Sequence, residues 1–192
     1  PFMKLLIRGG SIAAGHGVIR SYVDILKDDL RQQGITVLSR ARHRETSFDG
    51  IGTFEADVAG LRPDILLLHF GVADAFGCVY RSEFQENIVR IIRRARLSFR
   101  PVICLATAHT FDNPYEMDAA NIFYDSLRIT ASDLNCAFIP VHSYWAEYLA
   151  QHNLCSRDLV LADSRYPNPR GHEVIAAALG KWLEKICAAP PG

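Results

Sequence analysis

The run from Ile65 to Phe70 is the feature that most restricts how this chain can fold. It reads Ile-Leu-Leu-Leu-His-Phe and lacks the alternation of apolar and polar residues expected of a half-exposed strand. A continuous apolar strand is typical of a parallel sheet that is covered on both faces. We therefore expect a central parallel strand here, buried between two layers of helices.

The rest of the chain alternates apolar segments of strand length with amphipathic segments of helix length. We expect the other strands at Lys4–Arg8, Ile35–Ser39, Pro101–Ala106 and Cys136–Pro140. We expect helices at Ser21–Gln33, Phe54–Leu61, Glu83–Leu97 (with Ser82 as its N-cap), Asp118–Leu134, Tyr144–Gln151 and Arg170–Cys187, and loops at Arg40–Thr53 and Gly71–Tyr80. Alternating strands and helices predict βαβ crossovers, hence an α/β fold: a three-layer α/β/α sandwich with a five-stranded, mainly parallel sheet.

Length and charge limit the domain organisation and the partners. The 192 residues predict a single domain, which we place at residues 3–189. Pro1 and Phe2 precede Met3 and are expected to be additions ahead of a native start. The 21 basic and 21 acidic residues cancel, so no overall positive field attracts nucleic acid or an anionic membrane surface.

The cysteines and the apolar runs bear on location. The five cysteines are widely spaced, odd in number and form no Cys-x-x-Cys pair. This pattern argues against a disulfide framework and a zinc site, and it suits a reducing compartment. No run approaches the roughly 18 apolar residues of a transmembrane helix. We expect a cytoplasmic protein that binds neither membrane nor nucleic acid, with its oligomeric state open.

Parallel sheets bind ligands beyond the carboxyl ends of their strands. The loops at that edge are expected to be 9–17, 43–53, 71–80 and 107–117, joined by 161–171 if the last helix returns beside the first strand. The first loop holds Gly9, Gly10 and Ser11 between the first strand and the first helix. One structural interpretation of the two glycines is that the turn requires a positive φ.

The glycine–serine turn fits three kinds of site. The spacing from Gly10 to Gly15 is that of a phosphate loop, but His16 and Gly17 stand where lysine and Ser/Thr are needed. The segment Gly9-Gly10-Ser11-Ile12-Ala13 is nearly the Gly-x-Ser-x-Gly elbow of α/β-hydrolases, which normally follows several strands. The third kind depends on the rest of the chain.

Four segments, in order, resemble the sequence blocks of the SGNH (GDSL-type) hydrolases. They are Leu5–Gly15, with the serine turn after the first strand; Ser47–Gly52; Pro63–Asp74, with its strand and Gly-x-Asn-Asp-like turn; and Asp163–His172, resembling Asp-x-x-His-Pro-Asn. Together they span nearly the whole chain. The resemblance implies an SGNH-hydrolase, flavodoxin-like fold and hydrolysis of acyl or acetyl esters.

The functional residues of that family carry over unevenly. Ser11 matches the nucleophile, Asp163 the acid of the triad, and Gly50 (or Gly52) the glycine of the oxyanion hole, while Gly71 and Asp74 keep their places. Three positions depart from the pattern. Gly10 replaces the aspartate beside the serine, Ala73 replaces the oxyanion asparagine, and Tyr166 replaces the catalytic histidine.

These departures bear directly on the chemistry. A serine hydroxyl needs a base, and tyrosine, with a pKa near 10, is protonated at pH 7. Losing the base costs about 10⁴–10⁶ in rate, and losing one oxyanion donor about 10²–10³. His109 follows the fourth strand on the ligand side and is our candidate for a replacement base; His16 is the weaker alternative, since the helix that follows should point it away from Ser11. We expect His172 to cap or pack and His69 to be a hydrogen-bonded core residue.

Besides a nucleotide- or phosphate-binding module on the glycine–serine turn, two hypotheses for the function follow. The first is an ester hydrolase that acts through Ser11 with a non-standard or degraded site formed by Asp163, His109, Gly50, Ala73, Asp74 and Tyr166. The alternative is a catalytically inactive relative that binds a small ligand or a partner protein. We expect a small-molecule ester or carbohydrate-like ligand. We expect no cofactor, and no metal because the histidines and acids lack a ligand spacing.

Overall fold

The computed structural model describes residues 3–188, so the expectations for Pro1, Phe2 and residue 189 lie outside the described range. The strands are β1 (Met3–Gly9), β2 (Ile35–Ser39), β3 (Ile65–His69), β4 (Val102–Ala106) and β5 (Ala137–Ile139). The α-helices are α1 (Tyr22–Arg31), α2 (Ser47–Gly52), α3 (Val72–Phe76), α4 (Arg81–Ser98), α5 (Pro114–Asp133), α6 (Val141–Gln151) and α7 (Pro169–Ala188). A π-helical turn, η1 (Glu55–Ala59), follows α2, and a 3₁₀ turn, η2 (Ser156–Asp158), precedes α7.

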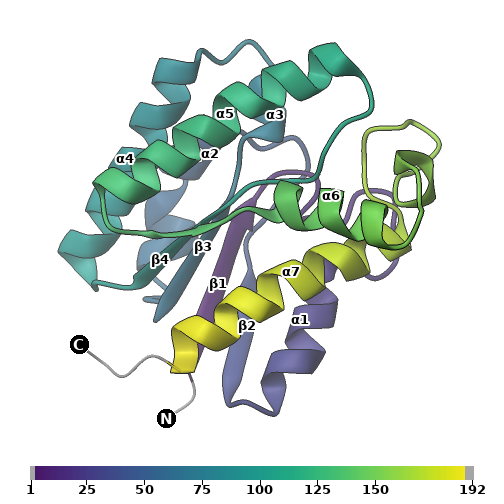
Figure 1. The fold of residues 1–192 in the computed structure, drawn as a ribbon. Coiled ribbons are helices and arrows are strands. Elements are labelled where there is room, and N and C mark those ends of the chain that lie inside the picture. Colours follow the sequence, from purple (N-terminus) through teal and green to yellow (C-terminus); the bar gives the residue numbers. More distant parts are fainter. Residues whose placement is uncertain (1–2, 189–192) are drawn as a thin grey trace.

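The five strands form one parallel sheet in the order β2-β1-β3-β4-β5. The expected α/β sandwich is confirmed, and the sheet is parallel throughout rather than mainly so (Figure 1). β3, the apolar run of the sequence, lies at the centre and all five of its residues are buried. Its neighbour β1 is in register with it, with Leu5 opposite Ile65 and Gly9 opposite His69.

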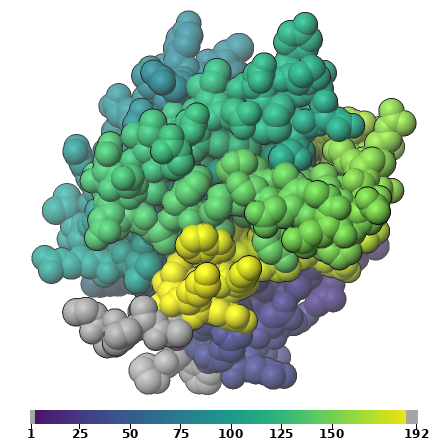
Figure 2. Space-filling view, in the orientation of Figure 1, coloured from purple at the N-terminus to yellow at the C-terminus, as the bar shows by residue number. Residues whose placement is uncertain are grey.

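Alternate side chains of the strands pack into two hydrophobic cores, one on each face of the sheet. Leu5, Ile7 and Leu67 face the side of α1 and α7, which contact each other. Leu6 and Leu68 face the side of α4. In the space-filling view, α5, α6 and α7 cover the face turned to the reader (Figure 2). Covering both faces explains why the central strands read as continuous apolar runs.

Short helices occupy two segments that were expected to be loops. Ser47–Gly52 forms α2, where the Asp49 carboxylate accepts hydrogen bonds from the Thr46 backbone and hydroxyl. Val72–Phe76 forms α3, whose first turn holds the buried Asp74. Both predictions of a loop were wrong because glycines dilute the helical pattern, whereas local capping and tertiary contacts stabilise these single turns.

The predicted N-cap of α4 was also wrong. The helix begins at Arg81 and its N-cap is Tyr80, whose backbone N–H donates to the Glu83 carboxylate at 3.0 Å. Within residues 3–188, no helix is both long enough and apolar enough to cross a bilayer.

The strand order determines where a ligand site can form. The chain leaves β1 toward β2 on one side and returns to β3 on the other side of β1. The connections after β1 and β3 therefore diverge and leave a crevice at the carboxyl ends of these two strands. Ser11 follows β1 and Gly71 follows β3, so both lie at this crevice.

Candidate active site

Ser11 lies on a series of turns between β1 and α1. The Ala14 N–H donates to the Gly10 carbonyl and the His16 N–H donates to the Ser11 carbonyl, each at 3.0 Å. The Ser11 side chain is nearly buried, and its Oγ accepts a hydrogen bond from the Arg44 backbone N–H at 2.8 Å. This arrangement fixes the serine at the carboxyl edge of the sheet, with one donor directed at its oxygen.

A cavity of about 310 Å³ opens beside Ser11. Four connections line it: the serine turn after β1, residues 44–46 before α2, residues 69–73, 76 and 77 at and beyond the end of β3, and Arg165 and Tyr166 before α7. Ala73 and Tyr166, which the resemblance places at the positions of an asparagine and a histidine, therefore share the cavity with Ser11. Its volume is at the small end of the range for ligand pockets in proteins.

Close backbone packing explains both glycines ahead of the serine. Neither adopts a positive φ, so that interpretation of the turn was wrong. A Cβ on Gly9 would lie 2.6 Å from the His69 carbonyl oxygen, and one on Gly10 would lie 2.7 Å from the Glu45 carbonyl oxygen. Because the neighbouring backbone occupies this space, the family's aspartate does not fit at position 10 without movement of the Glu45 loop.

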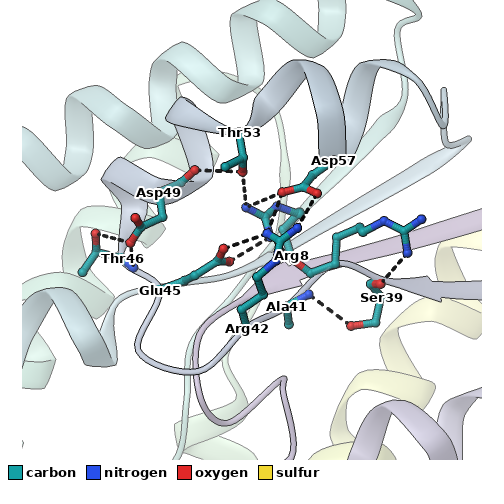
Figure 3. Close-up of polar contacts among 10 residues, drawn as sticks. Arg8, Ser39, Ala41, Arg42, Glu45, Thr46, Asp49, Thr53 and Asp57 are labelled. Carbon is teal, nitrogen blue, oxygen red and sulfur yellow. Dashed lines mark hydrogen bonds and ion pairs between the residues drawn. The ribbon is translucent and has the colours of Figure 1, made fainter.

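A cluster of charges, buried except for the half-exposed Arg42, supports the loop that contains Glu45. Arg8, at the end of β1, is 1% exposed and donates to the Glu45 carboxylate at 2.9 Å and to the Thr53 hydroxyl at 3.0 Å (Figure 3). Arg42 binds Glu45 at 2.8 Å and holds both oxygens of Asp57 at 2.7 Å. The hydrogen bonds from Arg42 lower the pKa of Asp57 to about 2. The cluster connects β1 to the segment that presents the Arg44 N–H.

The loop that carries Tyr166 into the cavity is anchored at three points. Oδ1 of Asp163 accepts the backbone N–H groups of Arg165 at 2.9 Å and Tyr166 at 3.1 Å. The Arg165 guanidinium forms an ion pair with Glu116 and lies over the Phe76 ring at 4.8 Å. The third anchor is a buried histidine beneath the loop.

That histidine is His109, which is fully buried and does not line the cavity. Its Nε2 lies 2.8 Å from the Arg165 carbonyl oxygen. A carbonyl only accepts, so Nε2 carries the proton and only Nδ1 is available as a base. Burial lowers the pKa of His109 to about 3. The ring is therefore neutral at pH 7, braces the Tyr166 loop, and is a weak proton acceptor in this conformation.

Gly50 and Asp74 lie away from the cavity. Gly50 is within α2, its N–H donates to the Thr46 carbonyl at 3.1 Å, and a Cβ there would meet the Phe70 ring. Asp74 is fully buried and accepts the backbone N–H and hydroxyl of Ser47 at 2.9 and 2.7 Å. Burial raises the pKa of the Asp74 carboxyl. Both residues stabilise the scaffold behind the cavity.

Two further histidines bind Tyr22, the first residue of the helix that follows the serine turn. His69, on the cavity wall, is hydrogen-bonded to the Tyr22 hydroxyl through Nδ1 at 2.7 Å. Nδ1 of His172 accepts the Tyr22 backbone N–H at 3.0 Å, which satisfies a free donor at the start of α1. The predictions of a buried, hydrogen-bonded His69 and of a capping or packing role for His172 are therefore confirmed, and the helix that His172 caps is α1.

Sequence reasoning missed two features near Ser11. Arg44 has a φ of 63°, and this backbone conformation directs its N–H at the serine oxygen. Because position 44 is not a glycine, the sequence does not indicate a positive φ there. The exposed His16 packs its ring against Tyr166, with centroids 4.5 Å apart. Neither His16 nor any other histidine between residues 3 and 188 hydrogen-bonds to Ser11 Oγ, whose partner is Arg44.

The residues described by the structure contain no group of three or more His, Cys, Asp or Glu side chains arranged to hold a metal ion. The ionisable groups around the cavity are instead engaged in ion pairs and loop contacts, with Arg44 as the exception.

The fold and site define a class of α/β protein that presents a serine on the turn after its first strand. A sequence profile of the GDSL-like Lipase/Acylhydrolase family matches residues 8–174. The chain therefore belongs to this family. A search of curated protein sequences found no match.

Solved structures show the same fold. A catalytic mutant of Axe2, an acetylxylan esterase from Geobacillus stearothermophilus, matches with a TM-score of 0.82 and 18% identity over 93% of each chain. A lipase/acylhydrolase from Enterococcus faecalis matches with a TM-score of 0.79 and 20% identity over 96% of each chain. TesA matches with a TM-score of 0.81 and 19% identity, covering 95% of this chain and 99% of that chain.

Proposed function

We propose that the chain binds acyl esters in the cavity beside Ser11 and hydrolyses them slowly, as an acyl hydrolase with a degraded catalytic site. The observation that carries this proposal is the position of Ser11 Oγ. It lines the cavity at the crevice between β1 and β3, where the Arg44 N–H donates to it at 2.8 Å. Family membership supports ester hydrolysis in general.

The chemistry would proceed through an acyl-serine. Ser11 Oγ attacks the ester carbonyl carbon, the C–O bond to the leaving alkoxide breaks, and the serine proton passes through water to that alkoxide. Water then attacks the acyl carbon, the bond from that carbon to Ser11 Oγ breaks, the carboxylic acid leaves, and a proton from the water restores the serine hydroxyl. The Arg44 N–H favours this route because a hydrogen bond to Ser11 Oγ stabilises the negative charge that this oxygen gains as it loses its proton.

The rate is limited because the cavity lacks a catalytic base and one oxyanion donor. Tyr166 stands where the family has its catalytic histidine, and Ala73 has no amide to donate to an oxyanion. A replacement of either kind removes several kcal/mol of transition-state stabilisation. We assign Asp163 and His109 as positioning residues that hold the loop bearing Tyr166, and we keep Ser11 as the proposed nucleophile.

Covalent labelling tests the proposal. Purified protein is incubated with a fluorophosphonate for several hours, and the adduct is located by peptide mass spectrometry. We expect slow, stoichiometric labelling of Ser11 and none in Ser11→Ala. An unmodified Ser11 after prolonged exposure, in a protein that remains folded, would rule out the nucleophilic role.

A non-catalytic ligand-binding protein is the second candidate, and the engaged state of His109 favours it. With Nε2 committed to the Arg165 carbonyl, His109 does not compensate for the missing base. This candidate predicts no adduct on Ser11 and no turnover, together with a rise in melting temperature when a ligand fills the cavity. The cytoplasmic location and the carbohydrate-like ligand stay predictions under either candidate.

A further inference from the structure

Arg44 combines an unfavourable backbone conformation with an unpaired charge. Its φ of 63° lies in the left-handed region, which costs an ordinary side chain about 1–2 kcal/mol relative to glycine. A glycine would present the same N–H to Ser11 without this cost. Strain kept at a site supports a role for the side chain itself.

Arg44, which lines the cavity, carries a charge that has no ion-pair partner among the residues that the structure describes. Among the ionisable residues that line it, Glu45 is paired with Arg8 and Arg42, and Arg165 is paired with Glu116. Arg44 is exposed and forms no ion pair with any residue that the structure describes.

The other left-handed arginines show that the conformation alone does not make a site. Arg62 and Arg100 have φ values of 45° and 52°. They lie just before β3 and β4, at the amino ends of the strands, which is the edge of the sheet opposite the cavity. Arg44 differs because its backbone N–H donates to Ser11 and the residue lines the cavity, with its charge exposed and unpaired.

We propose that Arg44 is a specificity-determining residue that binds an anionic group, a carboxylate, on the ester whose carbonyl lies at Ser11. The planar guanidinium donates a pair of parallel hydrogen bonds that match the two oxygens of a carboxylate. This inference rests on the proposed function in taking the ligand to be an ester. It adds that a charged ester is preferred over a neutral ester of the same size.

The test measures binding in the Ser11→Ala background, where no acyl transfer takes place. Monomethyl succinate carries its carboxylate on the acyl side, acetoxyacetate carries it on the alcohol side, and dimethyl succinate is the neutral reference. Each is titrated by NMR at low ionic strength. We expect at least one anionic ester to bind about tenfold tighter than the neutral one, in line with a charge-assisted hydrogen bond at an exposed site.

Arg44→Gly should abolish the preference without loss of thermal stability, because it removes the guanidinium and relieves the strain. Arg44→Asn should do the same, because asparagine tolerates the left-handed region. Arg62→Gly is the matched control, since it relaxes the same conformation at the opposite edge, and it should keep the preference. Added salt should weaken only the anionic esters.

Equal affinity for charged and neutral esters, no detectable binding of either, or a preference that survives in Arg44→Gly would each overturn the inference. The outcome is separable from that of the proposed function. Fluorophosphonate labelling reports on the reactivity of Ser11, whereas these titrations use a protein that lacks its hydroxyl.

Discussion

Replacement of Arg8 by methionine should destabilise the protein by about 3 kcal/mol. The guanidinium is 1% exposed and contacts Glu45 at 2.9 Å, Asp57 at 3.5 Å and the Thr53 hydroxyl at 3.0 Å, besides the Arg40 carbonyl. Breaking a buried ion pair from one side costs about 3–5 kcal/mol, since the partner stays buried and uncompensated. We take the lower end because Arg42 still binds both carboxylates.

Urea unfolding measures the effect. With a slope of about 2 kcal/mol per molar urea, the midpoint should fall by about 1.5 M. The matched control is Arg20→Met, which removes an ion pair between Arg20 and Asp28, whose side chains are 60% and 70% exposed. Because this pair is exposed, its loss should change the free energy of unfolding by less than about 0.5 kcal/mol. A loss below about 1 kcal/mol for Arg8→Met would refute the view that this cluster supports the site.

Two further predictions concern Glu45 and the charged residues around it. Gly10→Ala places a Cβ 2.7 Å from the Glu45 carbonyl oxygen, so we expect a lower melting temperature and weaker labelling of Ser11; a melting temperature equal to that of the wild type would contradict the close packing. The pKa of Asp57 falls from 3.8 to about 2 on folding, so its stabilisation of about 2 kcal/mol is complete well above pH 4 and is lost as the pH falls toward 2. The difference in unfolding free energy between the wild type and Asp57→Asn should therefore shrink between pH 6 and pH 2.5, and a constant difference would show that Arg42 does not hold the carboxylate charged.

The fold could be predicted from the sequence wherever burial of a segment determines its pattern of apolar residues. Ile35–Ser39 was predicted with its observed bounds, and β3 was predicted with one extra residue, because buried parallel strands leave uninterrupted apolar runs. The segment from Ser47 to Gly52 was missed. Two glycines weaken its helical signal, and the contacts of Ser47 with the buried Asp74 come from a distant part of the chain.

The site could be predicted from the sequence only in part. Ser11, Ala73 and Tyr166 could be placed from block order, because each follows a recognisable strand or precedes the last helix. The contribution of Arg44 could not be predicted, since it depends on a backbone angle that arginine rarely adopts. The hydrogen bond between His109 and the Arg165 carbonyl could not be predicted either, because sequence spacing does not show which loop covers a buried histidine.

The central claim is that Ser11 lies in an acyl-binding site that has lost its base and one oxyanion donor. The most direct measurement is the rate of 4-nitrophenyl acetate hydrolysis by the double variant Ala73→Asn, Tyr166→His. Both positions line the cavity with Ser11, so we predict a rise of at least about 100-fold over the wild type, and no rise when Ser11→Ala is added. A folded double variant with the rate of the wild type would contradict the claim.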